Sequence, residues 1–200
     1  MRYPLWKRIF DVVVAIMGLV LIFPLTPLIL IAIKLESRGP VIVKLERISE
    51  GRRIRVYKFR SMVKDADSMK ESLAHLNERK DGPLFKIKHD PRLTKVGKFL
   101  RKFRLDEFPQ LINVLRGELA IVGPRPREPR EAEQYPEEYK RILEARQGVT
   151  GLSQVNGASS LAFAKEIELD KSYTENITFI GDLKILFKTI AILFFDPTAV

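Results

Sequence analysis

The sequence contains no cysteine and only two histidines, and these absences narrow the chemistry that the protein can perform. Without cysteine there is no disulfide, no thiolate metal site and no cysteine nucleophile. The histidines, His75 and His89, are far apart in the sequence, and a zinc site is not expected. The glycine-rich segments do not have the spacing of a P-loop or of a dinucleotide-binding fingerprint. The composition therefore excludes thiolate chemistry and disfavours a zinc centre.

Basic residues outnumber acidic ones. The 200 residues include 35 Lys and Arg against 25 Asp and Glu, which gives a formal net charge of +10 and a pI near 9.8. This balance suits a partner that carries phosphate, such as an anionic lipid, a phosphorylated substrate or a nucleic acid. The length fits one domain in addition to a membrane segment.

An uncharged and mostly apolar run extends from Val12 to Ile33, with basic residues on both sides. About 20 such residues can cross a bilayer as a helix, but Lys and Arg near a membrane segment favour the cytoplasmic side. Pro24 lies in the middle of the run and predicts a bend, because proline removes a helical hydrogen bond. We therefore expect residues 1–40 to form a re-entrant membrane anchor and residues 41–200 to form a cytoplasmic, membrane-associated catalytic domain.

The sequence after the anchor predicts an α+β fold that is dominated by helices. Residues 41–48 and 53–59 have strand character around a turn-like segment, which predicts a small β-hairpin. Residues 121–130, which contain three prolines, are expected to form a rigid loop.

Several other segments have helical periodicity. The spacing of apolar residues predicts helices over 65–79, 108–116 and, with an interruption at Pro136, 131–146. Residues 96–104 and 182–195 interleave basic and apolar side chains, a pattern typical of amphipathic helices at a membrane interface. A solvated helix with one buried stripe explains residues 96–104 equally well.

Two adjacent carboxylates, Asp106 and Glu107, stand among basic residues at the start of an apolar-periodic stretch. The plain interpretation is helix capping, because Asp is a favoured N-cap residue. At a helix N-terminus the carboxylate of Asp106 would have a low pKa and would stay ionised, as a nucleophile must. Neighbouring side chains on a helix point about 100° apart, so the two carboxylates should have different tasks.

Cations accompany this pair in the sequence. Arg125 stands between two prolines in Gly123–Pro126, which restricts its backbone and presents its planar guanidinium to phosphate oxygens. Lys58 and Arg60 add cations near the hairpin. Each has a structural alternative, which is a rigid surface turn for Arg125 and a charge-protected edge strand for the other two.

A glycine-rich segment near residue 150 contains two amides. Gln154 and Asn156 follow Gly148–Gly151, and their side chains can hydrogen-bond to the polar edge of a base or a sugar. A plain turn is the alternative interpretation.

In order and spacing, these segments resemble the bacterial sugar transferases, the monotopic phosphoglycosyl transferases, over essentially the whole chain. The sequence is similar to the small form of that family, without the multi-span N-terminal region of larger relatives. The matching segments are Tyr57–Met62, Leu105–Glu107, Val122–Pro126, Gly148–Gly151, Gln154–Gly157 and Asp182–Ile185.

The resemblance implies a specific reaction and location. Family members move a sugar phosphate from a UDP-sugar to polyprenyl phosphate and release UMP, at the cytoplasmic face of the bacterial inner membrane. It implies that Asp106 is a nucleophile that forms a covalent phosphosugar intermediate, with Mg²⁺ held between Asp106 and the diphosphate. It also implies that Lys58, Arg101 and Arg125 line the phosphate site and that Pro24 breaks the re-entrant helix.

The sequence leaves two alternatives open. The charge and the basic-aromatic segments are also compatible with a membrane-anchored nucleic-acid binder, although the apolar run disfavours it, and we expect no nucleic-acid partner. The other alternative is a non-catalytic membrane scaffold. The chain departs from the family at Ala158, where relatives have an arginine, so that the nucleotide contact of this arginine has no assigned donor.

Overall fold

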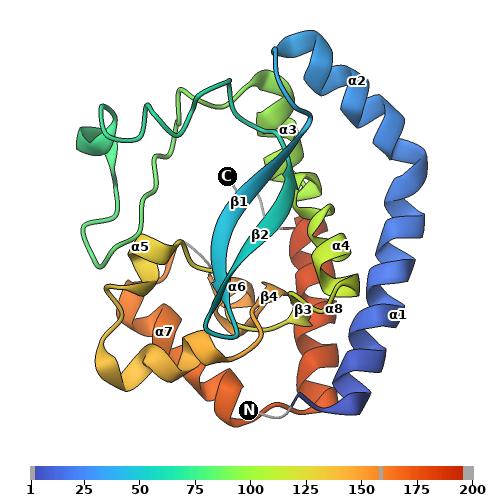
Figure 1. The fold of residues 1–200 in the computed structure, drawn as a ribbon, viewed down its shortest axis with the longest axis vertical. Coiled ribbons are helices and arrows are strands. Elements are labelled where there is room, and N and C mark those ends of the chain that lie inside the picture. Colours follow the sequence, from blue (N-terminus) through green and yellow to red (C-terminus); the bar gives the residue numbers. More distant parts are fainter. Residues whose placement is uncertain (1–2, 158–159, 196–200) are drawn as a thin grey trace.

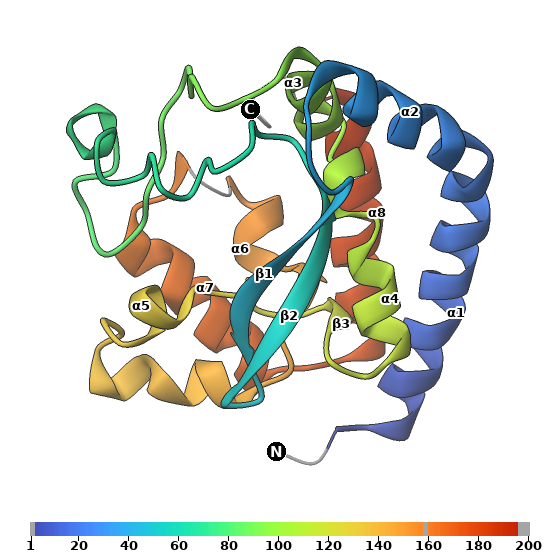
Figure 2. The ribbon, with the colours of Figure 1, turned by 45° about the horizontal axis from the view of Figure 1, so that its top comes forward.

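The structure, a computed structural model, describes residues 3–157 and 160–195. Two apolar helices, α1 (Leu5–Ile22) and α2 (Thr26–Glu36), run along one side of the molecule (Figures 1 and 2). The 3₁₀ turn η1 (Phe23–Leu25) joins them and contains Pro24. The chain changes direction at this turn, so the helix is interrupted where the proline predicts it.

The N-terminal end of this helix pair is fixed to the rest of the molecule by buried polar contacts. The ammonium group of Lys7 in α1 donates to the carbonyl of Val122 and to the hydroxyl of Tyr173, both at 2.9 Å, and forms an ion pair with Asp182. Lys7 and Asp182 are almost completely buried. Since buried charges are tolerated only when they are paired and hydrogen-bonded, these contacts define how α1 sits on the domain.

The C-terminal end is held by the same domain. The carboxylate of Glu36 in α2 accepts the backbone N–H groups of Lys95 and Val96 at 2.6 and 2.8 Å. These two residues begin α3 (Lys95–Lys102), so a side chain of the anchor satisfies donors at a helix N-terminus. Both ends of the α1–α2 pair therefore contact one compact body.

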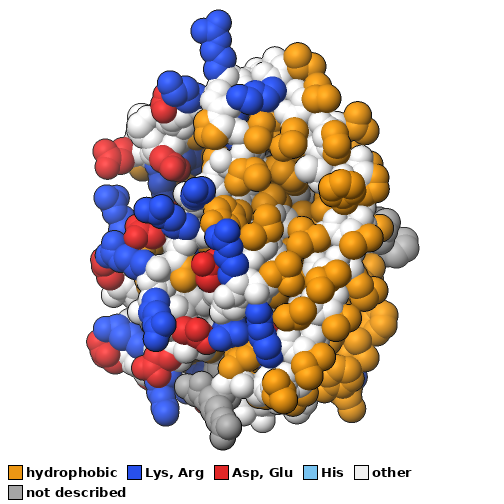
Figure 3. Space-filling model, turned by 45° about the vertical axis from the view of Figure 1, so that its right-hand side comes forward, with side chains coloured by type: hydrophobic (Ala, Val, Ile, Leu, Met, Phe, Trp, Pro, Cys, Tyr) orange, Lys and Arg blue, Asp and Glu red, His pale blue; other side chains and the backbone are white. Residues whose placement is uncertain are grey.

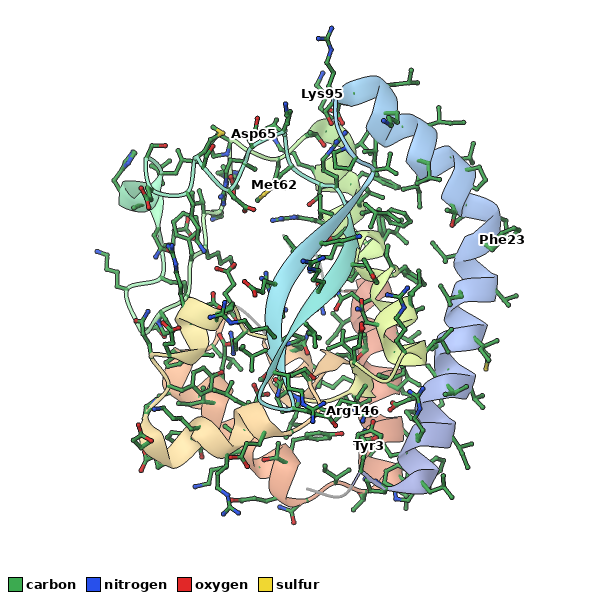
Figure 4. All side chains as sticks on the ribbon, viewed as in Figure 1. Tyr3, Phe23, Met62, Asp65, Lys95 and Arg146 are labelled. Atoms are coloured by element: carbon green, nitrogen blue, oxygen red, sulfur yellow. The ribbon has the colours of Figure 1, made fainter. Side chains whose placement is uncertain are left out.

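The outer side of α1 and α2 is apolar and uncovered. Within the stretch Leu5–Glu36, a window of 18 residues has a mean hydropathy of 2.7, and only 11% of that window is buried. Hydrophobic side chains gather over this side in Figure 3, and Phe23 points away from the domain at the bend (Figure 4). In length and composition this is the one helical stretch within residues 3–157 and 160–195 that could cross a membrane.

The predicted β-hairpin is confirmed. Strand β1 (Ile42–Ser49) pairs antiparallel with β2 (Arg52–Phe59), with Ile42 opposite Phe59 and Ser49 opposite Arg52. Glu50 and Gly51 both have positive φ, as a two-residue type I′ turn requires. The helix-dominated α+β class is confirmed with it.

A second, smaller sheet was not predicted. Strand β3 (Ala120–Val122) pairs parallel with β4 (Gly148–Thr150), so the first residues of the expected loop 121–130 are strand. Gly148 permits this contact, because a Cβ there would lie 2.1 Å from the backbone nitrogen of Gly123. This part of the glycine-rich segment thus packs the chain against the Pro-Arg-Pro loop.

The remaining elements surround these two sheets. In chain order they are η2 (Ala74–Leu76), η3 (Leu105–Glu107), α4 (Gln110–Leu115), α5 (Pro129–Ala132), η4 (Glu137–Glu144), α6 (Leu152–Val155), α7 (Phe163–Glu175) and α8 (Phe179–Phe195). The main core lies where α1, α4, α8 and the small parallel sheet meet, and it includes Ala15, Val114, Leu119, Val122 and Ile185. The helices predicted near 96–104, 108–116 and 182–195 are present as α3, α4 and α8.

The prediction of a helix over residues 65–79 is wrong. This segment forms successive turns that end in η2, and Asp65 has a φ of +61°. The hydroxyls of Ser68 and Ser72 bond to carbonyls three residues earlier, at 2.7 and 3.0 Å. Local side-chain bonds of this kind compete with the α-helical pattern, and the periodic apolar residues do not outweigh them.

Removing the buried charge of one partner tests the attachment of α1. Asp182→Asn should lower the free energy of unfolding by about 3–5 kcal/mol, because it leaves the ammonium of Lys7 buried without its ion-pair partner. Denaturant unfolding of the detergent-solubilised protein measures this. Lys34→Met, at an exposed lysine of α2, is the matched control. If Asp182→Asn unfolds like the control, the attachment does not depend on this ion pair.

Candidate active site

The carboxylate pair Asp106–Glu107 lies in η3, in the connection between α3 and α4. Arg104 precedes it with a φ of +51°, and the left-handed residue turns the chain away from the axis of α3. Helix α4 begins only at Gln110, with Pro109 as its N-cap residue. The prediction that Asp106 caps a helix is therefore wrong, because the dyad occupies a separate 3₁₀ turn.

The two carboxylates have opposite electrostatic environments. Asp106 is 6% exposed, and burial raises its pKa, while Lys58 and Arg101 act in the lowering direction. Burial would also raise the pKa of Glu107, but the charges of Lys58 and Arg125 lower it to about 2. The expectation of a depressed pKa for Asp106 is thus wrong, and the carboxyl group with the lowered pKa is that of Glu107.

Glu107 is paired and Asp106 is not. The ammonium of Lys58, which projects from β2, donates to a carboxylate oxygen of Glu107 at 2.6 Å. No side-chain donor among residues 3–157 and 160–195 bonds to the carboxylate of Asp106. The carboxylate of Asp106 therefore has a hydrogen bond with the backbone but no side-chain partner.

Two arginines expected at the site contribute to its electrostatic environment. Arg101 of α3 donates to the hydroxyl of Ser61 at 3.0 Å and lowers the pKa of Asp106 by its charge. Arg125 is exposed at the tip of its loop, and its charge acts on Glu107. Hydrogen bonds of 2.8 Å from Gly123 to Thr150 and from Gly148 to Pro124 hold this loop against β4.

Three predicted binding residues have their bonding partners elsewhere. Arg60 points to the end of the anchor, where its guanidinium donates to the carbonyl and hydroxyl of Ser37 at 2.6 and 3.0 Å. Gln154 is buried and donates to the carbonyl of Val149, while Asn156 donates to Leu152 and accepts from Lys188. Neither amide bonds to the dyad or to its cations. Ala158 lies outside the described residues.

Asn113 is a positioning residue that the sequence analysis missed. It is fully buried in α4, accepts the backbone N–H of Tyr57 at 3.0 Å and donates to the carbonyl of Arg55 at 2.8 Å. These bonds fix β2, and with it Lys58, beside the segment that follows the dyad. An amide within the apolar stretch 108–116 was the signal that could have identified it, because a polar group buried there needs partners.

The dyad meets the requirement for a magnesium ion that is shared with a substrate. No group of three or more Asp, Glu or His able to hold a metal occurs in the described part of the chain. Mg²⁺ at phosphoryl-transfer sites is commonly held by one or two carboxylates together with substrate phosphates and water. Of the two dyad carboxylates, only Glu107 is paired with a lysine, so the chemistry of the Asp106 carboxylate fits such a ligand.

The site combines an exposed cation, Arg125, with a buried carboxylate that has no side-chain partner, Asp106. This is the kind of site that suits a phosphorylated substrate. Fixed cations stabilise the charge of a phosphate ester, and a free carboxylate can act on its phosphorus or hold its metal. Comparison with known proteins identifies the family to which this chain belongs. The sequence model described as "Bacterial sugar transferase" matches residues 2–196, and the chain belongs to this family. It is therefore a transferase.

Characterised relatives cover most of the chain. The exopolysaccharide production protein ExoY of Rhizobium meliloti is 38% identical over 188 residues, which are 92% of this chain and 83% of that protein. The undecaprenyl-phosphate galactose phosphotransferase of Salmonella typhimurium is 40% identical over 190 residues, 92% of this chain and 39% of that protein. The UDP-glucose:undecaprenyl-phosphate glucose-1-phosphate transferase of Escherichia coli is 39% identical over 200 residues, which cover 93% of this chain and 39% of that protein.

The role of Asn113 can be measured through stability. Asn113→Leu should lower the free energy of unfolding by about 1–3 kcal/mol, because the backbone N–H of Tyr57 would be left buried without an acceptor. Asn176→Leu, an exposed change at the end of α7, serves as the control in the same denaturant titration. Equal stabilities of the two variants would show that Asn113 does not hold the hairpin.

Proposed function

We propose that the protein transfers a sugar 1-phosphate from a UDP-sugar to a polyprenyl phosphate of the undecaprenyl type and releases UMP. The names of the Salmonella and Escherichia relatives support this substrate class. The name of the Rhizobium relative supports a place in exopolysaccharide production. Our proposal places the reaction at the first membrane step of such a polysaccharide or glycoconjugate synthesis. The observation that carries the proposal is the unpartnered carboxylate of Asp106 next to the Lys58–Glu107 pair.

The first step is attack by Asp106 on the donor. Its carboxylate oxygen forms a bond to the phosphorus attached to the sugar, and the bond from that phosphorus to the UMP oxygen breaks. UMP leaves with the electron pair, so an aspartyl phosphosugar remains on the protein. Arg101 and Arg125 stabilise the charge that spreads over the phosphate oxygens.

The second step transfers the sugar phosphate to the lipid. An oxygen of polyprenyl phosphate attacks the same phosphorus, and the bond to Asp106 breaks and restores the carboxylate. Glu107, which is ionised because its pKa is about 2, orients Lys58 toward the incoming phosphate. A role of Glu107 as a proton acceptor agrees less well with so low a pKa.

Mg²⁺ bound by Asp106 and the diphosphate would neutralise charge on the donor. The chain's own residues perform the remaining tasks. Lys58 and Arg125 compensate the negative charge of the phosphates, and burial excludes water from the carboxylate that reacts. Exclusion of water protects an acyl phosphate from hydrolysis before the lipid acceptor arrives.

The same proposal includes a re-entrant anchor at the cytoplasmic face of the bacterial inner membrane. Both ends of the α1–α2 pair contact one domain, through Lys7 and through Glu36, and a bend with Pro24 separates them. The apolar side of the pair would lie in the bilayer, and the basic residues that flank it would stay inside. Helices α3 and α8 would then lie at the interface.

Substituting the nucleophile tests the chemistry. Asp106→Asn should lower UMP release from a UDP-sugar by about a thousandfold or more, because the amide cannot form the phosphosugar bond. Turnover is measured in detergent with Mg²⁺ and undecaprenyl phosphate, and a panel of UDP-sugars identifies the donor. Asp67→Asn, at an exposed aspartate, is the control. Near wild-type turnover of Asp106→Asn would remove this residue from the proposed role.

The pH dependence of turnover tests the electrostatics. The carboxylate of Asp106 must be ionised to react, and burial raises its pKa. As the pH is lowered, kcat/KM should therefore fall at a pH above the ordinary Asp pKa of about 4. The charge of Lys58 lowers the pKa of Asp106 more than any other charge does. The variant Lys58→Met should therefore shift the acid limb, which is the fall in kcat/KM at low pH, to higher pH. Lys44→Met, on the same hairpin, should leave the limb where it is in the wild type. An unshifted limb in Lys58→Met would contradict this assignment.

The natural absence of cysteine allows the topology to be measured by labelling. Single variants Leu5→Cys and Arg38→Cys report the two ends of the anchor, and His75→Cys reports the domain. A membrane-impermeant maleimide should label all three in inverted vesicles and none in intact spheroplasts. Labelling of the two anchor positions from opposite faces would show a spanning helix instead.

A further inference from the structure

A cavity of about 250 Å³ lies between α3 and the loop that precedes it. Three lysines line it, Lys88 from the loop and Lys98 and Lys102 from successive turns of α3. The apolar side chains of Leu93 and Phe99 also line it, together with His89 and Asp90. None of the residues that line it belongs to the carboxylate dyad or to the cations around it.

The positive charge of this cavity is not neutralised by the protein. Within the described residues, no ion pair or hydrogen bond uses the ammonium groups of the three lysines. The acidic residue in the wall, Asp90, is already bonded to the guanidinium of Arg92 at 2.9 and 2.7 Å. Like charges held around one cavity favour an anion as its occupant.

The surroundings of the cavity indicate that the anion belongs to a lipid. Phe99 and Phe103, both on α3, are 56% and 38% exposed. Helix α3 packs against α2, whose outer side chains are apolar and uncovered. A basic cavity beside exposed aromatic side chains and an apolar helix is the arrangement of a surface that meets lipid headgroups and acyl chains together.

We propose that this cavity binds the phosphodiester headgroup of an anionic phospholipid. Its volume is below the roughly 300–1,000 Å³ of pockets for drug-sized ligands and suits a small headgroup. The lysines contact the phosphodiester, while the acyl chains continue over Phe99 and Phe103 toward α2. The proposal does not rest on the transfer reaction, since its measurement is lipid binding.

The experiment follows the thermal unfolding of the full chain in a neutral detergent. Titration with dihexanoylphosphatidylglycerol should raise Tm in a saturable manner, because a ligand that binds the folded state stabilises it. Dihexanoylphosphatidylcholine and inorganic phosphate should have little effect. The variant Lys98→Gln/Lys102→Gln should weaken the apparent affinity for phosphatidylglycerol by about tenfold or more.

A matched variant controls for net charge. Lys140→Gln/Lys165→Gln removes the same charge at exposed lysines of η4 and α7 and should titrate like the wild type. If the α3 variant is too unstable to measure, Lys88→Gln on the loop gives an independent test with the same expected direction. An affinity equal to that of the wild type in the α3 variant or in Lys88→Gln would overturn the proposal, as would an equal response to phosphatidylcholine or to inorganic phosphate.

Discussion

The buried contact of Lys7 with Asp182 is the interaction on which the arrangement of this protein depends. It joins the first turns of an apolar helix to α8, and the same ammonium reaches the carbonyl of Val122 at the end of β3. A charge pair without water is stable only while both partners and their hydrogen bonds are present. The anchor and the domain therefore have one relative orientation, which Glu36 reinforces at the other end.

The position of the site around Asp106 depends on this attachment of α1. Helix α1 packs on α4 and β3, α4 follows the dyad directly, and Asn113 of α4 holds the hairpin that carries Lys58. The carboxylate of Asp106 is thereby buried beside its ionised neighbour, between an apolar anchor and a cationic loop. This combination meets two demands of the proposed reaction, in which the reacting carboxylate avoids water and a lipid acceptor approaches it from the side of the apolar helices.

Local features of the fold could be predicted from the sequence, and features set by packing could not. Pro24 and the turn at Glu50 act through backbone geometry, so the break in the helix and the hairpin followed from local rules. The burial that raises the pKa of Asp106 results from contacts between distant segments, and the sequence pattern pointed the other way. Arg60 was assigned to the site because it is close to Lys58 in sequence, but its guanidinium bonds to Ser37 at the end of the anchor.

Mass spectrometry of the intact protein after exposure to donor alone tests the central claim most directly. With a UDP-sugar and Mg²⁺ but no lipid acceptor, the account predicts a mass increase of one sugar phosphate, located by peptide mapping at Asp106. Addition of polyprenyl phosphate should remove this increase. The contradicting result has two parts. The protein releases UMP when donor and lipid acceptor are both present, but with donor alone and rapid quenching it never acquires the adduct at Asp106. In that case the buried carboxylate is not the nucleophile.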